Sequence, residues 1–545
     1  MKKKIFYLII IIFMSIISML PILTNTNIMG HDTNFHIANI NAIKKDLNNN
    51  ILIDKLLPDI GNSFNYGTHL FYPPLPHYST AYLAKITELF KLSTLDTLAI
   101  MYLLITIISS IIMFFLAKKI TNNNPLSLLS TLIFILMPYR LGDIIVRSAL
   151  NEAFTFIFIP LILLSLLELI NHDKKKFLIL FVIGYTGLIY SHLIITLYFS
   201  LFLIPFIFIY WHKLFNKETL LLITKAIVLV TILVLPLIIP LIEVKLQGNY
   251  LVFQDNYLSG IAYVKAFSNT IKDYITILKD YSWEVPRFIP ISVICITIVS
   301  ILTYLKAKKS NKTINFLIIF SLLAFIISLD IFPWEYVPKF LYMIQFPWRC
   351  ETMLVISLSL IAPLFITYIK KPSLKLGTTV ITILIILITC LPFLTKLSTH
   401  TYLTTSSIDP NLGMGHSQEY LPVNTYNNID YFNNRDQSIK NITDTSLITV
   451  IKNTNKELVF TINNKANEVT LELPRLYYPG YQIKSKTGIL IEQKENPSGF
   501  LEITIKGSGT YYVTSPGTKL TQITRFISLT GLIYFIYLLL KKERT

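Results

Sequence analysis

The chain has 545 residues, of which 53% are hydrophobic and only 14% are charged. Soluble globular proteins carry about 25% charged residues, so this composition excludes a soluble enzyme as the main body, and its hydrophobicity excludes a disordered chain. The formal net charge is +17, which in a membrane protein first indicates Lys- and Arg-rich cytoplasmic loops, so we expect no nucleic-acid partner. The three cysteines provide no disulfide framework.

Long apolar runs recur along the whole chain. A transmembrane helix needs about 20 mainly apolar residues, and the sequence predicts about twelve such spans. They are 5–23, 98–116, 126–141, 154–170, 177–190, 193–211, 220–241, 288–305, 314–329, 350–368, 376–394 and 526–540. The first run follows three lysines, as in a signal peptide, but its core is longer than usual and no A-x-A site follows, so we interpret it as a retained anchor.

Short basic loops fall at every second gap between the predicted spans. The positive-inside bias places these loops and both chain termini in the cytoplasm, and they account for the whole formal charge surplus. The other gaps then face outward, and three of them are long. They contain nearly all the His, Trp and Arg residues and the acidic clusters, so we look for chemistry there.

The chain is expected to form three parts. Residues 1–394 form a transmembrane module whose first outer loop, 24–97, carries amphipathic helices; 395–522 form an outer β-rich domain; and 523–545 add a last span and a cytoplasmic tail. The β assignment rests on partly alternating stretches separated by Asn, Gly and Pro turns, at 458–462, 469–473, 489–491 and 501–505. The predicted fold class is an α-helical polytopic membrane protein with a small extracytoplasmic β-sandwich-like domain.

A polar segment, GHDTNFH at 30–36, opens the first outer loop. Ile40 and Ile43 follow at helical spacing, and residues four apart are neighbours on a helix, so Asp32 and His36 would share its apolar stripe. Asp32 is a candidate catalytic carboxylate. It is equally consistent with a helix N-cap, and a cap could still face a substrate with its second oxygen.

Further along this loop, His69 and Tyr72 stand beside paired prolines, which fix an extended turn. Aromatic and His side chains in a rigid turn suit a wall on which a sugar stacks. The alternative is an interfacial belt of aromatic residues.

Arginines mark two other outer segments. Arg140 and Arg147 are seven residues apart, so two helical turns would put them on one face with Asp143 between them, and Arg349 follows Trp348. Arginine binds phosphate through a planar fork of donors, which suits the head of a phosphorylated lipid. The alternative is snorkelling of arginine side chains to the head groups.

Zinc is not expected, because the histidines show no metal-ligand spacing. A lone His192 at the end of a span is interpreted as structural. The outer β-rich domain contributes Glu419 in a Glu-Tyr-Leu-Pro stretch, for which turn formation and packing are the alternative.

Five stretches, in this order, together resemble a known family. They are HDTNFH at 31–36, YPPL at 72–75, PYRLGD at 138–143, QFPWR at 345–349 and EYLP at 419–422. The set resembles bacterial multi-pass proteins catalogued as "6-pyruvoyl-tetrahydropterin synthase-related membrane protein". That family is similar in plan to the GT-C glycosyltransferases, which use polyprenyl-phosphate sugars. The chain has no soluble pterin-synthase domain and no His cluster for its zinc, so its catalogue name implies no activity here.

The resemblance implies a GT-C-like enzyme in a bacterial plasma membrane. GT-C enzymes place an acidic residue in the first outer loop, a position matched by Asp32. Many show two adjacent acids there, whereas this chain has His31 before Asp32, so the need for a divalent cation, Mg²⁺ or Mn²⁺, stays open. Basic outer residues contact the lipid phosphate in those enzymes; Arg140, Arg147 and Arg349 match them.

The predicted activity is inverting transfer of a sugar from a polyprenyl-phosphate donor to a cell-envelope polymer, lipid or protein on the outer face. Asp32 would be the general base, and the remaining candidates would line the substrate site: His36, His69, Tyr72, Glu152, Trp348 and Glu419. One alternative is a transporter or flippase of lipid-linked sugars, which would place ionisable groups inside the bilayer. The other is a non-catalytic membrane protein of envelope assembly.

Overall fold

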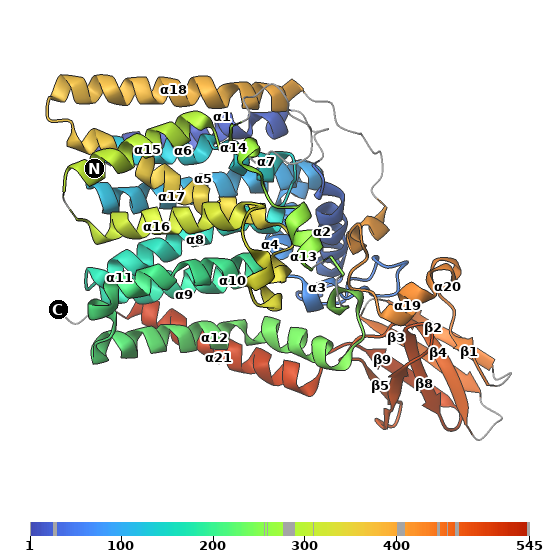
Figure 1. Ribbon diagram of the computed structural model, residues 1–545. Coiled ribbons are helices and arrows are strands. Elements are labelled where there is room, and N and C mark those ends of the chain that lie inside the picture. Colours follow the sequence, from blue (N-terminus) through green and yellow to red (C-terminus); the bar gives the residue numbers. More distant parts are fainter. Residues whose placement is uncertain are drawn as a thin grey trace. The chain divides into compact units, whose positions relative to one another are not determined.

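The computed structural model describes residues 2–24, 30–254, 257–258, 260–275, 289–308, 310–399, 409–443, 447–454, 456–463 and 468–541. Most of them are helical, and the strands all come late in the sequence (Figure 1). Contacts divide the chain into two compact units. The first unit comprises Met1–Thr33, Lys91–Val230 and Leu258–Thr405, and the second comprises Asn34–Phe90, Thr231–Tyr257 and Ser406–Thr545.

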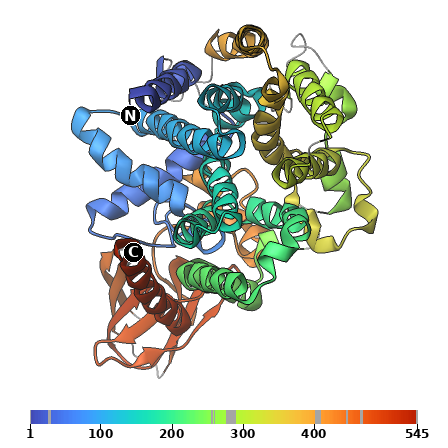
Figure 2. The ribbon, with the colours of Figure 1, turned by 90° about the vertical axis from the view of Figure 1, so that its left-hand side faces the viewer.

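Apolar helices dominate the first unit, and Figure 2 shows them nearly end-on, so they run side by side. The long ones are α1 (Lys2–Thr24), α5 (Thr94–Thr121), α6 (Asn124–Leu136), α7 (Pro138–Ile145), α8 (Leu150–Ile170), α9 (Lys174–Ser191), α10 (Leu193–Phe202), α11 (Ile204–Leu214), α15 (Ile291–Lys306), α16 (Lys312–Ser328), α17 (Glu351–Ile361) and α18 (Pro372–Thr399). Short 3₁₀ segments η6 (Pro347–Cys350) and η7 (Ala362–Tyr368) flank α17.

Every predicted span coincides with a helix or with consecutive helices. Within the described residues, seven are long and apolar enough to cross a membrane, and two bent pairs, α6–α7 and α10–α11, raise this number to nine. The helices α15 and α16 are apolar but shorter. The chain thus has the helices of a polytopic membrane protein, whereas the number of twelve spans and the orientation of the termini stay predictions.

The bend between α6 and α7 has a local cause. Met137 has φ −60° and ψ 119°, an extended conformation that a following proline favours, because the ring of Pro138 clashes with a helical residue before it. The helix therefore stops at Leu136 and restarts at Pro138 at an angle of 44°.

The second unit combines short helices, the end of one long helix, a second long helix and all the described strands. Its helices are α2 (Thr33–Asn48), which begins directly before this unit, α3 (Thr68–Phe71), α4 (Leu75–Thr87), the end of α12 (Lys217–Gln247), α19 (Val423–Asn427), α20 (Ile429–Asn434) and α21 (Lys519–Leu540). The predicted apolar face is confirmed for His36, Ile40 and Ile43 of α2, which are buried. Asp32 does not share it, because α2 begins one residue later and Asp32 is half-buried.

Two antiparallel sheets form the β region. One has the order β1-β4-β8-β7 and the other β2-β3-β9-β5-β6. The strands are β1 (Lys440–Asn441), β2 (Leu447–Asn453), β3 (Glu457–Asn463), β4 (Val469–Leu476), β5 (Gln482–Ser485), β6 (Leu490–Ile491), β7 (Gln493–Glu495), β8 (Phe500–Ile505) and β9 (Gly509–Thr514). All four predicted stretches coincide with strands, β3, β4, β6 and β8, so the β-rich assignment is confirmed.

Candidate functional site

A backbone contact in the first unit fixes the position of Asp32. The N–H of His31 donates to the carbonyl of Val146 at 3.0 Å, and the N–H of Asp32 donates to the carbonyl of Arg147 at 2.8 Å. Gly30 permits this approach, because a Cβ there would lie 2.6 Å from the oxygen of Val146. The segment before α2 is therefore tied to the turn between α7 and α8.

That turn corrects one prediction from the sequence. Helical spacing placed Arg140 and Arg147 on one face, but α7 ends at Ile145 and Arg147 lies in the following turn. Ser148 closes the turn with φ +57°, a left-handed conformation that costs a non-glycine residue about 1 kcal/mol or more. Strained residues of this kind are concentrated at functional sites, so the turn is a candidate site element.

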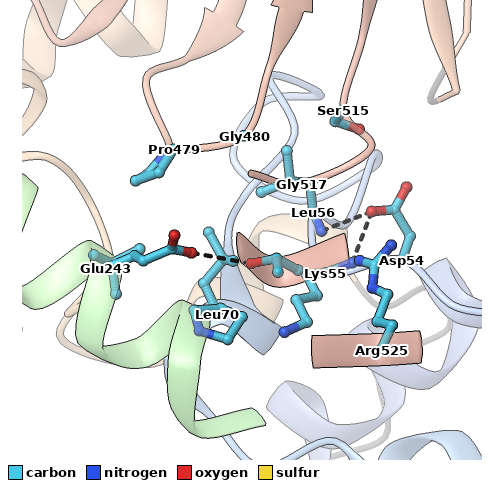
Figure 3. A pocket seen from close by; sticks show the side chains of 13 residues that line it. Asp54, Lys55, Leu56, Leu70, Glu243, Pro479, Gly480, Ser515, Gly517 and Arg525 are labelled. Atoms are coloured by element: carbon cyan, nitrogen blue, oxygen red, sulfur yellow. Dashed lines mark hydrogen bonds between the residues drawn. The ribbon is translucent and has the colours of Figure 1, made fainter. Parts of the chain in front are cut away.

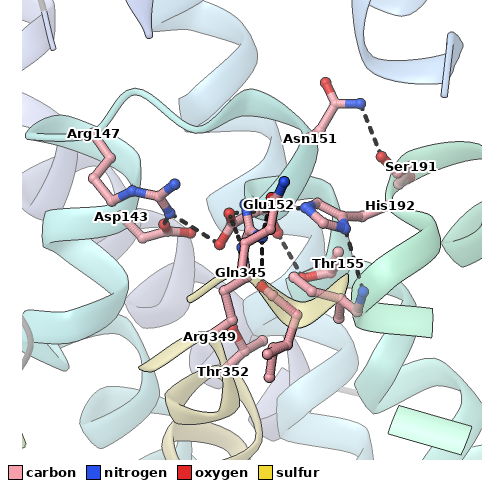
Figure 4. A network of polar contacts seen from close by, with 12 residues as sticks. Asp143, Arg147, Asn151, Glu152, Thr155, Ser191, His192, Gln345, Arg349 and Thr352 are labelled. Carbon is pink, nitrogen blue, oxygen red and sulfur yellow. Dashed lines mark hydrogen bonds and ion pairs between the residues drawn. The ribbon is translucent and has the colours of Figure 1, made fainter. Parts of the chain in front are cut away.

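Glu152 bridges two arginines at the centre of a buried charge cluster (Figure 4). Its Oε2 lies 3.0 Å from Nη1 of Arg147, and its Oε1 accepts from Nε of Arg349 at 3.0 Å. None of the three side chains is more than about a tenth exposed. Glu152 belongs to the first turn of α8, where the helix dipole favours a negative charge.

Asp143 completes the surroundings of Arg147. Its Oδ1 accepts from Nη1 of Arg147 at 2.5 Å, whereas its Oδ2 is buried and has no hydrogen-bond partner among the described residues. In the sequence Asp143 is recognisable only as a residue between two arginines, whereas the turn at 146–149 brings the guanidinium of Arg147 to its carboxylate.

Arg349 is held by the chain that precedes it. Its Nη1 donates to the carbonyl of Ile344 at 2.9 Å and to Oε1 of Gln345 at 3.2 Å, and its guanidinium lies 4.6 Å from the ring centre of Phe346. Gln345 has φ +60°, a second strained residue at this cluster. The 3₁₀ segment η6 thus presents Arg349 in one fixed orientation.

Trp348 packs beneath the cluster and is only 2% exposed. The guanidinium of Arg147 stands 4.4 Å from its ring centre, and the ring of Phe346 stacks on it at 5.3 Å. A desolvated cation over an indole ring is stabilised by about 2 kcal/mol. In this structure Trp348 supports Arg147, and direct contact with a substrate stays a prediction.

His192 faces the same carboxylate from the junction of α9 and α10. Its Nδ1 accepts the N–H of Ile195 at 3.3 Å and so caps α10. The neutral ring then carries its proton on Nε2, which lies 3.8 Å from Oε1 of Glu152. The interpretation of His192 as a structural residue is therefore incomplete, since it caps α10 and also belongs to the cluster.

Burial and the charges of the cluster together shift the pKa of Asp32. Burial raises the pKa of its half-buried carboxyl above the ordinary value, and the charge of Glu152 adds to this effect, while Arg147 and Arg349 oppose it. A carboxylate with a raised pKa is a stronger base than an ordinary aspartate. Asp32 can therefore accept a proton at the edge of a cluster that also supplies two cations.

A divalent cation does not fit this set of side chains. Asp143 and Glu152 already face guanidinium groups, and among the described residues no three His, Cys, Asp or Glu stand close enough together to hold a metal ion. We therefore build no step on Mg²⁺ or Mn²⁺.

The hydrogen bonds and ring contacts of Arg140 are with residues outside this charge cluster. It is fully buried, and its Nη2 donates to the hydroxyls of Thr106 and Ser109 of α5 at 3.1 and 3.3 Å. Its guanidinium lies 4.8 Å from the ring centre of Phe134 and 5.3 Å from that of Phe156. Its predicted contact with a lipid phosphate remains a prediction.

The other predicted site residues belong to the second unit: His36, His69, Tyr72 and Glu419. His36 and His69 are buried against His77, and Nδ1 of His36 lies 2.7 Å from Nε2 of His77. Burial lowers the pKa of His69 to about 4. Tyr72 and Glu419 are half-buried. That these four share a site with Asp32 stays a prediction.

Comparison with known proteins identifies a family but no activity. The model of a family of unknown function (DUF6541) matches residues 5–343. The chain belongs to this family. An "Uncharacterized protein" of Lactococcus lactis subsp. cremoris (strain MG1363) is 23% identical over 348 residues, which are 60% of this chain and 54% of that relative. The aligned part thus spans about half of the relative. The family match includes Asp32, Arg147 and Glu152 and ends before Arg349.

Proposed function

We propose that this protein is a membrane glycosyltransferase of the GT-C type that moves a sugar from a polyprenyl-phosphate donor to an envelope acceptor on the outer face of the bacterial plasma membrane. The observation that carries the proposal is the position of Asp32. A half-buried carboxyl with a raised pKa is fixed by its backbone beside the turn that presents Arg147. Such a pair offers a base and a phosphate-binding cation side by side.

The proposed reaction is a single inverting displacement. An acceptor hydroxyl oxygen attacks the anomeric carbon while its proton passes to the carboxylate of Asp32. The bond from that carbon to the phosphate oxygen breaks, and its electron pair leaves with the lipid phosphate. A positioned general base contributes about 10²–10⁴-fold to such a step.

Arg147 and Arg349 would receive the departing phosphate. The described ion pairs and hydrogen bonds of these two side chains use Nη1 of Arg147 and Nε and Nη1 of Arg349. The Nη2 groups are not used by those contacts, and an arginine fork suits phosphate oxygens. Donors that are already oriented stabilise a developing negative charge without reorganisation.

One acidic residue suffices for this chemistry. A glycosidase needs a second carboxyl group to protonate its leaving group, whereas a lipid phosphate leaves as a stable anion. The roles of Asp143 and Glu152 in the proposal are therefore to hold and orient the two arginines rather than to transfer protons.

The test is a transfer assay. Full-length protein in lipid vesicles is given radiolabelled polyprenyl-phosphate sugars and envelope fractions as acceptors, with Asp32→Asn and Asp330→Asn compared in parallel. Asp330 is a matched control because it is an exposed aspartate of the same unit outside the site. We expect transfer by the wild type and the control, and a loss of at least about 10²-fold in Asp32→Asn. Undiminished transfer by Asp32→Asn would remove the role of Asp32.

A transporter or flippase of lipid-linked sugars is the second candidate, and Arg140 favours it. This fully buried arginine lies among apolar helices and makes no ion pair with a described residue. Charges inside a bilayer often mark a substrate path. Movement of a labelled lipid-linked sugar across the vesicle bilayer, sensitive to Arg140→Met and without sugar transfer, would favour this alternative.

A further inference from the structure

A pocket in the second unit is lined by four ionisable side chains that the proposed reaction does not use. Asp54 and Lys55 come from the loop before α3, Glu243 from the last turns of α12, and Arg525 from the second turn of α21. Figure 3 shows Lys55 between Glu243 and Arg525. Gly480 and Gly517 contribute the wall formed by the loops of the β region.

Lys55 is held at a point where α12 lacks a helical hydrogen bond. Pro240 has no N–H, so the carbonyl of Pro236, four residues earlier, has no helical hydrogen-bond donor. The ammonium group of Lys55 donates to that carbonyl at 2.5 Å. An ammonium has three donors, so this bond fixes Lys55 and leaves further N–H groups for a ligand. Burial and the nearby Arg525 lower the pKa of Lys55 to about 7.

The two carboxylates are likewise held by neutral groups. Glu243 accepts from the hydroxyl of Thr518 at 2.7 and 2.9 Å and from that of Thr521 at 3.0 Å. Asp54 accepts the backbone N–H groups of Lys55 and Leu56 at 2.7 and 3.1 Å. These hydrogen bonds orient both carboxylates without neutralising them.

Arg525 completes the set. Its Nη1 donates to the carbonyl of Pro516 at 3.1 Å, and its side chain is exposed at the pocket. Among the described residues, none of the four charged groups forms an ion pair with another or with any third residue. Two cations and two carboxylates therefore surround one pocket, and each is oriented by a hydrogen bond with a neutral group.

This pattern selects the chemistry of a ligand. A simple anion would be repelled by Asp54 and Glu243, and a simple cation by Lys55 and Arg525. A neutral ligand would cover charged groups without providing opposite charges, which is costly. From this arrangement we infer that the pocket binds a zwitterion whose phosphate contacts Lys55 and Arg525 and whose ammonium contacts Glu243 and Asp54.

The position of the pocket suits a phospholipid head group of this chemistry. Glu243 lies at the C-terminal end of α12 and Thr518 at the N-terminal end of α21, and the hydrogen bonds between them join these two ends. Both helices are long and apolar enough to cross a membrane. A pocket where two such apolar helices end is in reach of lipid head groups. A free phosphoethanolamine offers the same ammonium and phosphate groups, although its phosphate monoester carries about −1.5 to −2 charges at pH 7 instead of the single charge of the lipid diester.

Binding of defined lipids to the full-length protein tests this site. Native mass spectrometry in a nonionic detergent gives the affinities for phosphatidylethanolamine, which is zwitterionic with hydrogen-bonding N–H groups, and for phosphatidylglycerol, which is anionic. We expect phosphatidylethanolamine to bind about tenfold more tightly, the effect of one charge-assisted hydrogen bond. Equal affinities for the two lipids would overturn the inference.

Variants assign the binding to this pocket. Arg525→Gln changes an exposed side chain and should keep the fold, and Lys55→Met removes the buried cation; each should weaken phosphatidylethanolamine binding by about tenfold. Glu243→Gln should reduce the preference over phosphatidylglycerol. Lys45→Met, which removes an exposed lysine of the same unit, is the control and should bind as the wild type. Unchanged binding in Arg525→Gln and Lys55→Met would contradict the site.

A separate titration with soluble O-phosphoethanolamine distinguishes the two sources. Saturable binding that is lost in Arg525→Gln would identify a free zwitterion as sufficient. Binding of the lipid alone would identify a membrane head group as the ligand. Failure to bind either compound would overturn the inference, and neither result depends on the sugar-transfer activity proposed above.

Discussion

The backbone N–H of Asp32 donates a hydrogen bond to the backbone carbonyl of Arg147, 2.8 Å away. This contact joins the residue proposed as the base to the residue proposed to bind phosphate, without using either side chain. The carboxylate of Asp32 and the Nη2 group of Arg147 are thereby left for chemistry, and the separation of the two side chains depends on how closely the two backbone segments approach. A substitution that pushes these two backbone segments apart should therefore displace Asp32 and Arg147 before it disturbs the surrounding helices.

Gly30→Ala should disrupt this approach. The new Cβ would lie 2.6 Å from the oxygen of Val146 and 2.7 Å from Cβ of Ser148, and overpacking of this kind costs about 1–3 kcal/mol. We expect a lower unfolding temperature and reduced sugar transfer. The matched control is Gly377→Ala in α18, where a Cβ meets no atom within 4 Å. It should be neutral or slightly stabilising, since alanine favours a helix by about 1 kcal/mol; equal loss in both variants would contradict the argument.

Asp32→Asn should separate stability from activity. Because burial raises the pKa of Asp32 in the folded protein, its ionised form lowers stability at pH values above the folded pKa. That penalty is relieved as the pH falls through the folded pKa. At pH 7 the variant should unfold at the same temperature as the wild type or higher, while transfer falls by about 10²-fold or more. A clear loss of stability at pH 7 would show that the ionised carboxylate supports the fold instead.

Glu152→Gln should be among the most destabilising changes in the first unit. It leaves the buried Arg147 and Arg349 without their shared carboxylate, and breaking a buried ion pair costs about 3–5 kcal/mol. Glu218→Gln, at an exposed pair with Lys174, should change stability by less than about 0.5 kcal/mol. Thermal unfolding in detergent measures both. If Arg349→Met added to Glu152→Gln costs as much again, the two side chains do not act as a pair.

The buried histidines of the second unit should make stability depend on pH. The pKa of His69 is lowered to about 4 by burial, so the unfolded chain binds a proton that the folded chain does not. Stability should be fully present above the unfolded value of about 6.5 and should fall as the pH drops toward 4, by about 2 kcal/mol between pH 7.5 and 5. His69→Gln should flatten this dependence in unfolding curves. Replacing the exposed His172 by Gln should leave the slope intact.

The sequence predicted the helices and strands well because their signals are local. An apolar run long enough to span a membrane is complete within one element, and all the predicted spans coincide with helices. The bend at Met137 was hidden within the run 126–141, because an apolar residue before a proline does not interrupt the hydrophobic pattern.

The site was predicted only in part, because its contacts are not local. Asp32 and the arginines were recognised as candidates from their outer loops, but a sequence contains no signal that pairs residue 32 with residue 147. The spacing argument for Arg140 and Arg147 was wrong because the helix ends between them. The sequence does not show that His192 belongs to the charge cluster, because its partner, Glu152, lies on another helix.

The bridge from Glu152 to Arg349 spans 197 residues of sequence. During synthesis, Glu152 and Arg147 emerge together, whereas Arg349 follows only after α9 to α16 have been made. Until then the carboxylate has one arginine instead of two, in a segment rich in apolar surface. The charge cluster therefore becomes complete late in synthesis. A chain truncated before residue 349 would lack the second arginine of the cluster, and we expect membrane quality control to recognise it.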